Sequence, residues 1–298
     1  MKIIFMGTPE FARACLQGLT DAGHEVMCVV TQPDRPAGRG KKPRMSAVKV
    51  CAMELGLEVL QPERVNCADF TQVLKKFDAD IFVVAAYGQI LSQKLLDMPK
   101  YGAINVHASL LPLYRGAAPI QKAILDGQTK TGITIMQMDK GMDTGDMLLK
   151  KEVEISASDT GGTLHDKLCS IACEPLLQVL EQIKNGTCNP QKQDHEKATY
   201  APMITKDMAK INFDQNAHDI VNMVRAYNPH PGATTQVNDK ILKIWNAQVS
   251  STAPKLCPKD GILMATKSNT LHVLEVTPPN GKRMTAADYV KGLATVHN

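Results

Sequence analysis

The residues best suited to chemistry lie in the stretch 104–121, where Asn105 and His107 stand two positions apart in an apolar run. Residues two apart in an extended strand leave the same face, so the amide and the imidazole would point the same way. Asp143 lies in the glycine-rich segment 139–146 and could approach His107 from a turn. A donor amide, an imidazole and an orienting carboxylate are the groups needed for acyl transfer without a covalent nucleophile.

Each of the three side chains has a role that follows from its chemistry. Asn105 can donate an amide N–H to an oxyanion, a contact whose loss typically raises a barrier by about 3–4 kcal/mol. Histidine titrates near neutral pH, so His107 suits general acid–base work, with Asp143 setting its tautomer or helping to move protons. No G-x-S-x-G elbow is present to supply a serine nucleophile.

The elements that must position these residues alternate between strand and helix. Short apolar runs typical of parallel strands buried on both faces occur at 2–6, 25–31, 80–86 and 104–107, and helical segments lie between them. This order predicts an α/β domain with a doubly wound, mostly parallel sheet, which places its site at the carboxyl ends of the strands. Only Gly7 of a G-x-G-x-x-G pattern follows the first strand, so a nucleotide-binding dehydrogenase is disfavoured.

A basic segment at 32–45 contains five Lys or Arg residues and one acid. Its three prolines and two glycines predict an exposed, mobile loop without regular structure. Such a concentration of charge favours contact with a phosphate backbone over a merely solvated loop. Its candidate nucleic-acid contacts are Arg39, Lys41 and Lys42.

The rest of the chain predicts a long helix and then a second domain. A helix is expected over 159–184, where His165, Cys169 and Cys173 recur every four residues and favour a packed core face over a metal site. Polar residues 190–206 indicate a linker. Beyond it, 207–298 has short alternating strands and ten Lys or Arg against seven acids, which predicts a small OB-like β-barrel that holds RNA. The expected domains are therefore 1–189 and 207–298.

The amino-acid composition is typical of a globular protein with reduced cysteines. The chain has 298 residues, a net charge of +4 and 44% apolar residues, as in an ordinary globular protein. Its eight cysteines form no CxxC pair and indicate reduced thiols. No signal peptide and no run long enough for a membrane span are seen, so a cytoplasmic enzyme is expected. We also expect a monomer that binds no metal.

Three motifs together, Asn105-x-His107, Ser109-Leu110-Leu111-Pro112 and Asp143-Thr-Gly-Asp, resemble those of the folate-dependent formyltransferases over nearly the whole chain. The basic segment and the second domain are similar to those of the members that act on methionyl-tRNA. The resemblance implies a Rossmann-like formyltransferase domain. It also implies transfer of a formyl group from 10-formyltetrahydrofolate to the α-amine of methionyl initiator tRNA, for translation initiation.

The same resemblance assigns residues to parts of that reaction. It implies that Asn105, His107 and Asp143 form the catalytic trio. It also implies that Ser109, Leu110, Leu111 and Pro112 form the folate-binding loop, and that Arg39 lies in a loop entering the acceptor stem. Leu113-Tyr114 stands where the family more often has Arg-Trp. A small-amine formyltransferase, a formyl-folate hydrolase and a non-catalytic RNA-binding protein stay open as alternatives.

Overall fold

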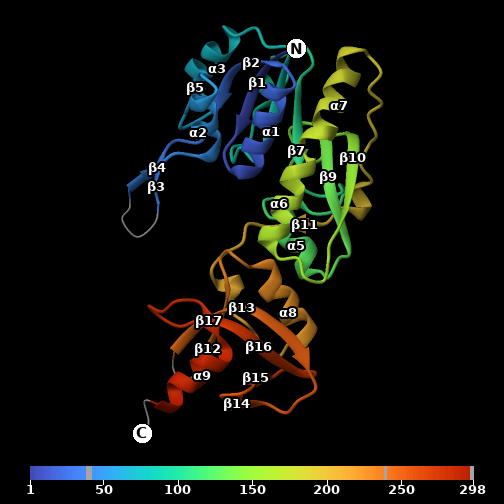
Figure 1. Ribbon diagram of the computed structural model, residues 1–298. Helices are drawn as coiled ribbons and strands as arrows, with labels where there is room; N and C mark the ends of the chain where they lie inside the picture. The colour runs from blue at the N-terminus through green and yellow to red at the C-terminus, as the bar shows by residue number, and fades with distance from the viewer. Residues whose placement is uncertain (38–41, 238–239, 296–298) are drawn as a thin grey trace. The chain divides into compact units, whose positions relative to one another are not determined.

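The computed structural model describes residues 1–37, 42–237 and 240–295 (Figure 1). The chain divides into two compact units. The first comprises Met1–Gly116, Thr131–Val153 and His165–Tyr200, and the second Ala117–Lys130, Glu154–Leu164 and Ala201–Asn298. The division of the chain at 189 and 207 stays a prediction.

The first unit is built on a seven-stranded sheet in the order β10-β9-β7-β6-β1-β2-β5. Strands β5, β2, β1, β6 and β7 are mutually parallel, and β9 runs antiparallel to β7. The predicted doubly wound, mostly parallel sheet is therefore confirmed. The strands are β1 (Lys2–Gly7), β2 (Glu25–Val30), β5 (Val59–Leu60), β6 (Ile81–Ala85), β7 (Ala103–His107), β9 (Lys130–Gln137) and β10 (Met147–Glu154).

Helices cover both faces of this sheet (Figure 1). On one face, α1 (Glu10–Asp21) packs against β1, α2 (Ala47–Glu54) and α7 (Cys173–Lys184). On the other face, Ile4 and Met6 of β1 share a buried cluster with Leu74 and Leu95, from α3 (Ala68–Lys75) and α4 (Gln93–Leu96). Because the strands are buried on both sides, they are continuous apolar runs in the sequence.

The single helix expected over 159–184 is wrong, because the segment forms α6 (Gly161–Ile171) and α7, with a break at Ala172. Pro175 has no N–H to donate to the carbonyl of Ile171, so an unbroken helix would lack one backbone hydrogen bond at this position. In the first turn of α7 a missing N–H costs nothing. The fully buried row on these helices is Leu164, Leu168, Ala172 and Leu176. The predicted stripe of His165, Cys169 and Cys173 lies beside that row and is only partly buried.

The absence of regular structure expected over 32–45 is also wrong. Strands β3 (Arg35–Ala37) and β4 (Lys42–Arg44) pair antiparallel, with Pro36 directly opposite Pro43. In an antiparallel pair of strands, directly opposed residues alternate between hydrogen-bonded and non-hydrogen-bonded pairs. Proline has no N–H, so it cannot donate the hydrogen bond that a hydrogen-bonded pair requires. The two prolines therefore share a non-bonded pair, where no ladder bond is lost.

The second unit contains the predicted antiparallel β domain. Its sheet has the order β12-β13-β16-β15-β14, with β17 beside β16. Residues of α8 and α9 share one buried core with the sheet. The elements are α8 (Ala217–Ala226), β12 (Ala233–Val237), β13 (Lys240–Ser250), β14 (Lys255–Cys257), β15 (Gly261–Ala265), β16 (Thr270–Thr277), β17 (Met284–Thr285) and α9 (Ala286–Thr295). Shorter elements of the chain are β8 (Arg115–Gly116), α5 (Pro119–Leu125), η1 (His195–Lys197), β11 (Tyr200–Ala201) and η2 (Asp207–Ala209).

Candidate active site

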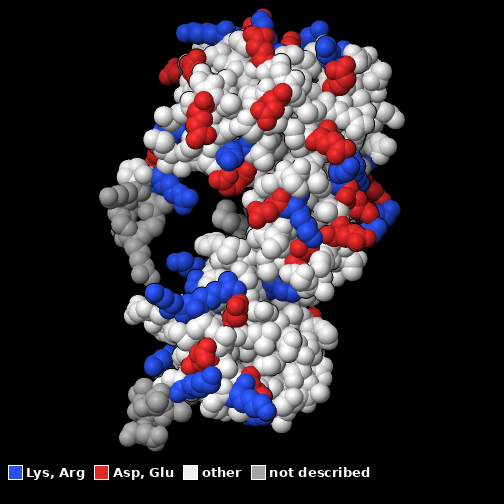
Figure 2. All heavy atoms as spheres, in the orientation of Figure 1, with Lys and Arg blue, Asp and Glu red and all other residues white. Residues whose placement is uncertain are grey.

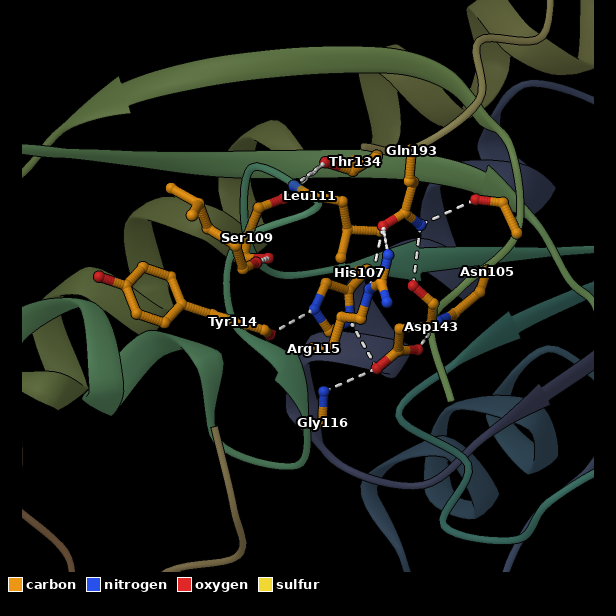
Figure 3. A network of polar contacts seen from close by, with 12 residues as sticks. Asn105, His107, Ser109, Leu111, Tyr114, Arg115, Gly116, Thr134, Asp143 and Gln193 are labelled. Carbon is orange, nitrogen blue, oxygen red and sulfur yellow. Dashed lines mark hydrogen bonds and ion pairs between the residues drawn. The ribbon is translucent and has the colours of Figure 1, made fainter. Parts of the chain in front are cut away.

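Strand β7 ends at the candidate site, between parallel β6 and antiparallel β9. Asn105 and His107 are two residues apart on this strand and so share a face. Asp143 reaches them from the turn between β9 and β10 (Figure 3). That turn requires Gly145, because a Cβ there would lie 1.8 Å from the carbonyl oxygen of Gln137.

The structure brings the three predicted side chains together around the Asp143 carboxylate. Asn105 Nδ2 donates to Asp143 Oδ1 over 3.4 Å, and His107 Nδ1 lies 3.7 Å from Oδ2. The backbone N–H of Gly116 donates to Oδ2 at 2.8 Å, which is the shortest of these contacts and holds the carboxylate in place. The amide and the imidazole are therefore only loosely engaged by Asp143.

A backbone carbonyl decides where His107 carries its proton. His107 is 6% exposed, and its Nε2 lies 2.9 Å from the carbonyl oxygen of Tyr114. A carbonyl oxygen only accepts, so Nε2 must be the protonated nitrogen. The expectation that Asp143 sets the tautomer is thus corrected: Tyr114 sets it, since 3.7 Å from Nδ1 to Asp143 is beyond hydrogen-bond range. In the neutral ring, Nδ1 is the nitrogen free to take up a proton.

The loop after β7 is held by one buried threonine. Thr134 of β9 donates to the carbonyl of Ser109 at 2.6 Å and accepts from the N–H of Leu111 at 3.1 Å. Ser109 and Leu111 are fully buried, so in this loop only Leu110 and Pro112 present side-chain surface. The prediction that this loop contacts folate therefore concerns those two side chains and the backbone.

The sequence profile described as "Formyl transferase" matches residues 1–180, and the one described as "Formyl transferase, C-terminal domain" matches residues 203–294. The chain belongs to the formyl transferase family. The methionyl-tRNA formyltransferase of Clostridioides difficile is 46% identical over 98% of this chain and 97% of that relative. The methionyl-tRNA formyltransferase of Caldanaerobacter subterraneus is 47% identical over the same shares.

Several solved structures share the fold at low sequence identity. The methionyl-tRNA formyltransferase of Clostridium thermocellum is 16% identical, with a TM-score of 0.58, over 85% of this chain and 95% of that one. WlaRD, a sugar 3N-formyl transferase, is 18% identical with a TM-score of 0.69, over 95% and 99%. HypX from Aquifex aeolicus in complex with tetrahydrofolic acid is 14% identical with a TM-score of 0.66. That match covers 97% of this chain and 47% of HypX, so the chain spans about half the length of HypX.

In this formyl transferase, three residues that support the site were not predicted. Thr199 Oγ1 accepts from the N–H of Tyr114 at 2.9 Å. Arg115 and Gln193 are 2% and 5% exposed and hydrogen-bond to each other. Gln193 and Thr199 come from the polar segment expected to be a linker, where no periodicity marks a buried side chain.

We call the paired strands β3 and β4, residues 35–37 and 42–44, the β3–β4 arm; it contains one of the three residues predicted to contact RNA. Arg39 and Lys41 lie outside the described residues, and Lys42 begins β4. The base of the arm is fixed by Asp34, whose carboxylate pairs with Lys49 at 2.6 Å and accepts from Gln61 at 2.9 Å. These hydrogen bonds, first that from Lys49, hold the pKa of Asp34 below its usual range.

None of the helices in the described part of the chain combines the length and apolar character that crossing a membrane requires. Among the residues described, no three His, Cys, Asp or Glu side chains are placed to hold a metal ion.

Proposed function

We propose that this formyl transferase moves the formyl group of 10-formyltetrahydrofolate to the α-amine of methionyl initiator tRNA, giving N-formylmethionyl-tRNA. The observation that carries the proposal is the convergence of Asn105, His107 and Asp143 at the carboxyl end of β7. It is supported by relatives of 46–47% identity over 98% of the chain that are named methionyl-tRNA formyltransferase. We further propose that the protein acts as a monomer in the cytoplasm.

The amine of the aminoacyl group is itself the nucleophile. Its ordinary pKa is about 7.7–8.0, so a useful fraction is unprotonated at neutral pH. The protein must then stabilise negative charge on the formyl oxygen and manage one proton. Asn105 donates an amide N–H to that oxygen, a contact worth about 3–4 kcal/mol in the barrier. Asn105 suits this role because its bond to Asp143 is long, at 3.4 Å.

His107 handles the proton. The N–H at Nε2 donates to the backbone carbonyl of Tyr114, so Nδ1 is the nitrogen that accepts the proton lost by the attacking amine. His107 then passes this proton to the folate nitrogen from which the formyl group departs. The Asp143 carboxylate, 3.7 Å from Nδ1, stabilises the imidazolium formed in between. The Asp143 side chain is 17% exposed against 6% for that of His107, so it is the more accessible route to solvent.

Three further parts of the chain bind the substrates. The loop 109–112 contacts the folate through its backbone and through Leu110 and Pro112, which keep exposed surface. The β3–β4 arm and the basic residues Arg39, Lys41 and Lys42 contact the tRNA backbone near the acceptor end. Figure 2 shows more basic than acidic side chains on the viewed face of the second unit, which supports a role for that unit in holding RNA.

The decisive experiment incubates the protein with methionyl initiator tRNA and 10-formyltetrahydrofolate labelled in the formyl group. Labelled formyl-methionine released by hydrolysis of the tRNA is the expected product. An amino-sugar nucleotide and free methionine serve as alternative acceptors. Labelled formate without an acceptor would indicate a hydrolase, and transfer to the sugar alone would indicate a small-amine formyltransferase.

A further inference from the structure

Gln193 is a buried amide whose four hydrogen bonds fix its orientation. Its Oε1 accepts from Arg115 Nε at 3.0 Å and from Nη2 at 2.7 Å. Its Nε2 donates to the carbonyls of Asp143 and Gly145, both at 2.8 Å. A guanidinium only donates, so the oxygen of the amide must face Arg115 and the NH₂ group must face the turn. Figure 3 shows Gln193 between Arg115 and the Asp143 turn.

Arg115 is itself held so that it cannot turn away from Gln193. Its side chain is 2% exposed, and its Nη2 also donates to His195 Nδ1 at 3.1 Å. A buried guanidinium whose donors were unmatched would cost several kcal/mol, so these contacts are strongly maintained. The planar fork of Arg115 therefore determines which way the Gln193 amide points.

The backbone that Gln193 holds is in a conformation that needs support. Asp143 has a φ of +52°, in the left-handed region that L residues with a side chain rarely adopt. Gln193 holds the carbonyl of Asp143 and, two residues on, that of Gly145. The N–H of Gly116, the residue after Arg115, holds the carboxylate of Asp143 at 2.8 Å. Two consecutive residues therefore support Asp143: Arg115 supports its backbone through Gln193, and Gly116 holds its carboxylate directly.

We propose that Gln193, oriented by Arg115, is a positioning residue that keeps the Asp143 carboxylate beside His107 Nδ1. It touches neither substrate nor the reacting atoms and acts only through the turn. This inference rests on the proposed formyl transfer, because it assigns Gln193 a role in the same site. It also places part of the active-site support in residues 190–206.

The test is the isosteric substitution Gln193→Glu. Glutamate keeps an acceptor for Arg115 but turns a second oxygen toward the carbonyls of Asp143 and Gly145, so the turn loses both donors. We expect kcat to fall by about 10- to 100-fold, since a displacement near 1 Å in an active site can cost about 100-fold. The KM for each substrate should change by less than about threefold. The matched control is Gln191→Glu, the same change at an exposed site two residues away, which should leave activity unchanged.

A double-mutant cycle separates positioning from general damage to the fold. Asp143→Asn removes the charge that Gln193 is proposed to place. In that background, single-turnover rates should change by less than about twofold on adding Gln193→Glu. Losses that multiply would overturn the inference, as would a Gln193→Glu variant that matches Gln191→Glu. If Gln193→Glu does not fold, Gln193→Met is used in the same cycle; unfolding of both would show a purely structural role and overturn the inference.

A crystal structure of Gln193→Glu supplies a readout independent of activity. The Asp143 carboxylate should leave its place 3.7 Å from His107 Nδ1, and an unchanged turn would overturn the inference. The two proposals fail differently. Wild-type protein that formylates no amine contradicts the proposed function, whereas active wild-type protein with an insensitive Gln193→Glu variant contradicts only the positioning role.

Discussion

Thr134→Val tests whether one buried hydroxyl holds the loop after β7. The Thr134 hydroxyl donates to the carbonyl of Ser109 and accepts from the N–H of Leu111, and both residues are fully buried. Valine keeps the shape of the side chain, so no cavity opens. What changes is that a buried carbonyl and a buried N–H both lose their partner.

The size of the effect follows from those two groups. Leaving one buried polar group unpaired costs about 1–3 kcal/mol, so two such groups cost about 2–6 kcal/mol before the loop relaxes. We expect a loss of about 2–4 kcal/mol in the free energy of unfolding of the first unit. That is a large part of the 5–15 kcal/mol or so that stabilises a typical domain.

The same strand supplies the control. Thr131 is 2% exposed, and among the described residues its hydroxyl has no hydrogen-bond partner. Thr131→Val should therefore be neutral or slightly stabilising. Urea unfolding is followed by far-UV circular dichroism, because the single tryptophan, Trp245, lies in the second unit and would report on the wrong part. Equal losses for the two variants would refute the assignment of Thr134.

Three further predictions concern the site and the arm. Asn105→Ala should lower kcat by about 10²- to 10³-fold, and His107→Ala by about 10²- to 10⁴-fold. The affinity of either variant for tRNA, measured by filter binding, should stay within about threefold of the wild-type value. A rise in KM without a fall in kcat would contradict both catalytic roles. Arg39→Ala should slow formylation of initiator tRNA more than that of a variant with a fully paired acceptor end, since A-form RNA hides its major groove; equal slowing indicates a mere electrostatic tether. Because Lys49 lowers the pKa of Asp34, that carboxylate anchors the arm above about pH 4 and loses this effect as pH falls through its lowered pKa. Hydrogen exchange in the arm should therefore differ between wild type and Asp34→Asn at pH 7, and the difference should vanish at low pH.

The sequence predicted best what is encoded locally. The period of two in β7 and the glycines around Asp143 both act over a few residues, so the approach of Asn105, His107 and Asp143 could be expected. The β3–β4 pairing was missed because prolines usually exclude strands, and the register that accommodates Pro36 opposite Pro43 is not visible in composition. Gln193 was missed because its partners are 48 to 78 residues away and no local pattern marks such a contact.

The contact between Tyr114 and His107 has a consequence for how the acceptor specificity of such an enzyme can change. The proton of His107 is placed by a main-chain carbonyl, which every amino acid supplies, and not by the side chain of Tyr114. Proline would lose the N–H that Thr199 accepts, and β-branched residues would strain the backbone at a φ of +61°. The Tyr114 side chain is buried, so a smaller residue there would also leave a cavity beside the loop. Substitution at the neighbouring Leu113, which is exposed, can thus change the surface that the loop presents while the carbonyl that places the proton of His107 stays unchanged.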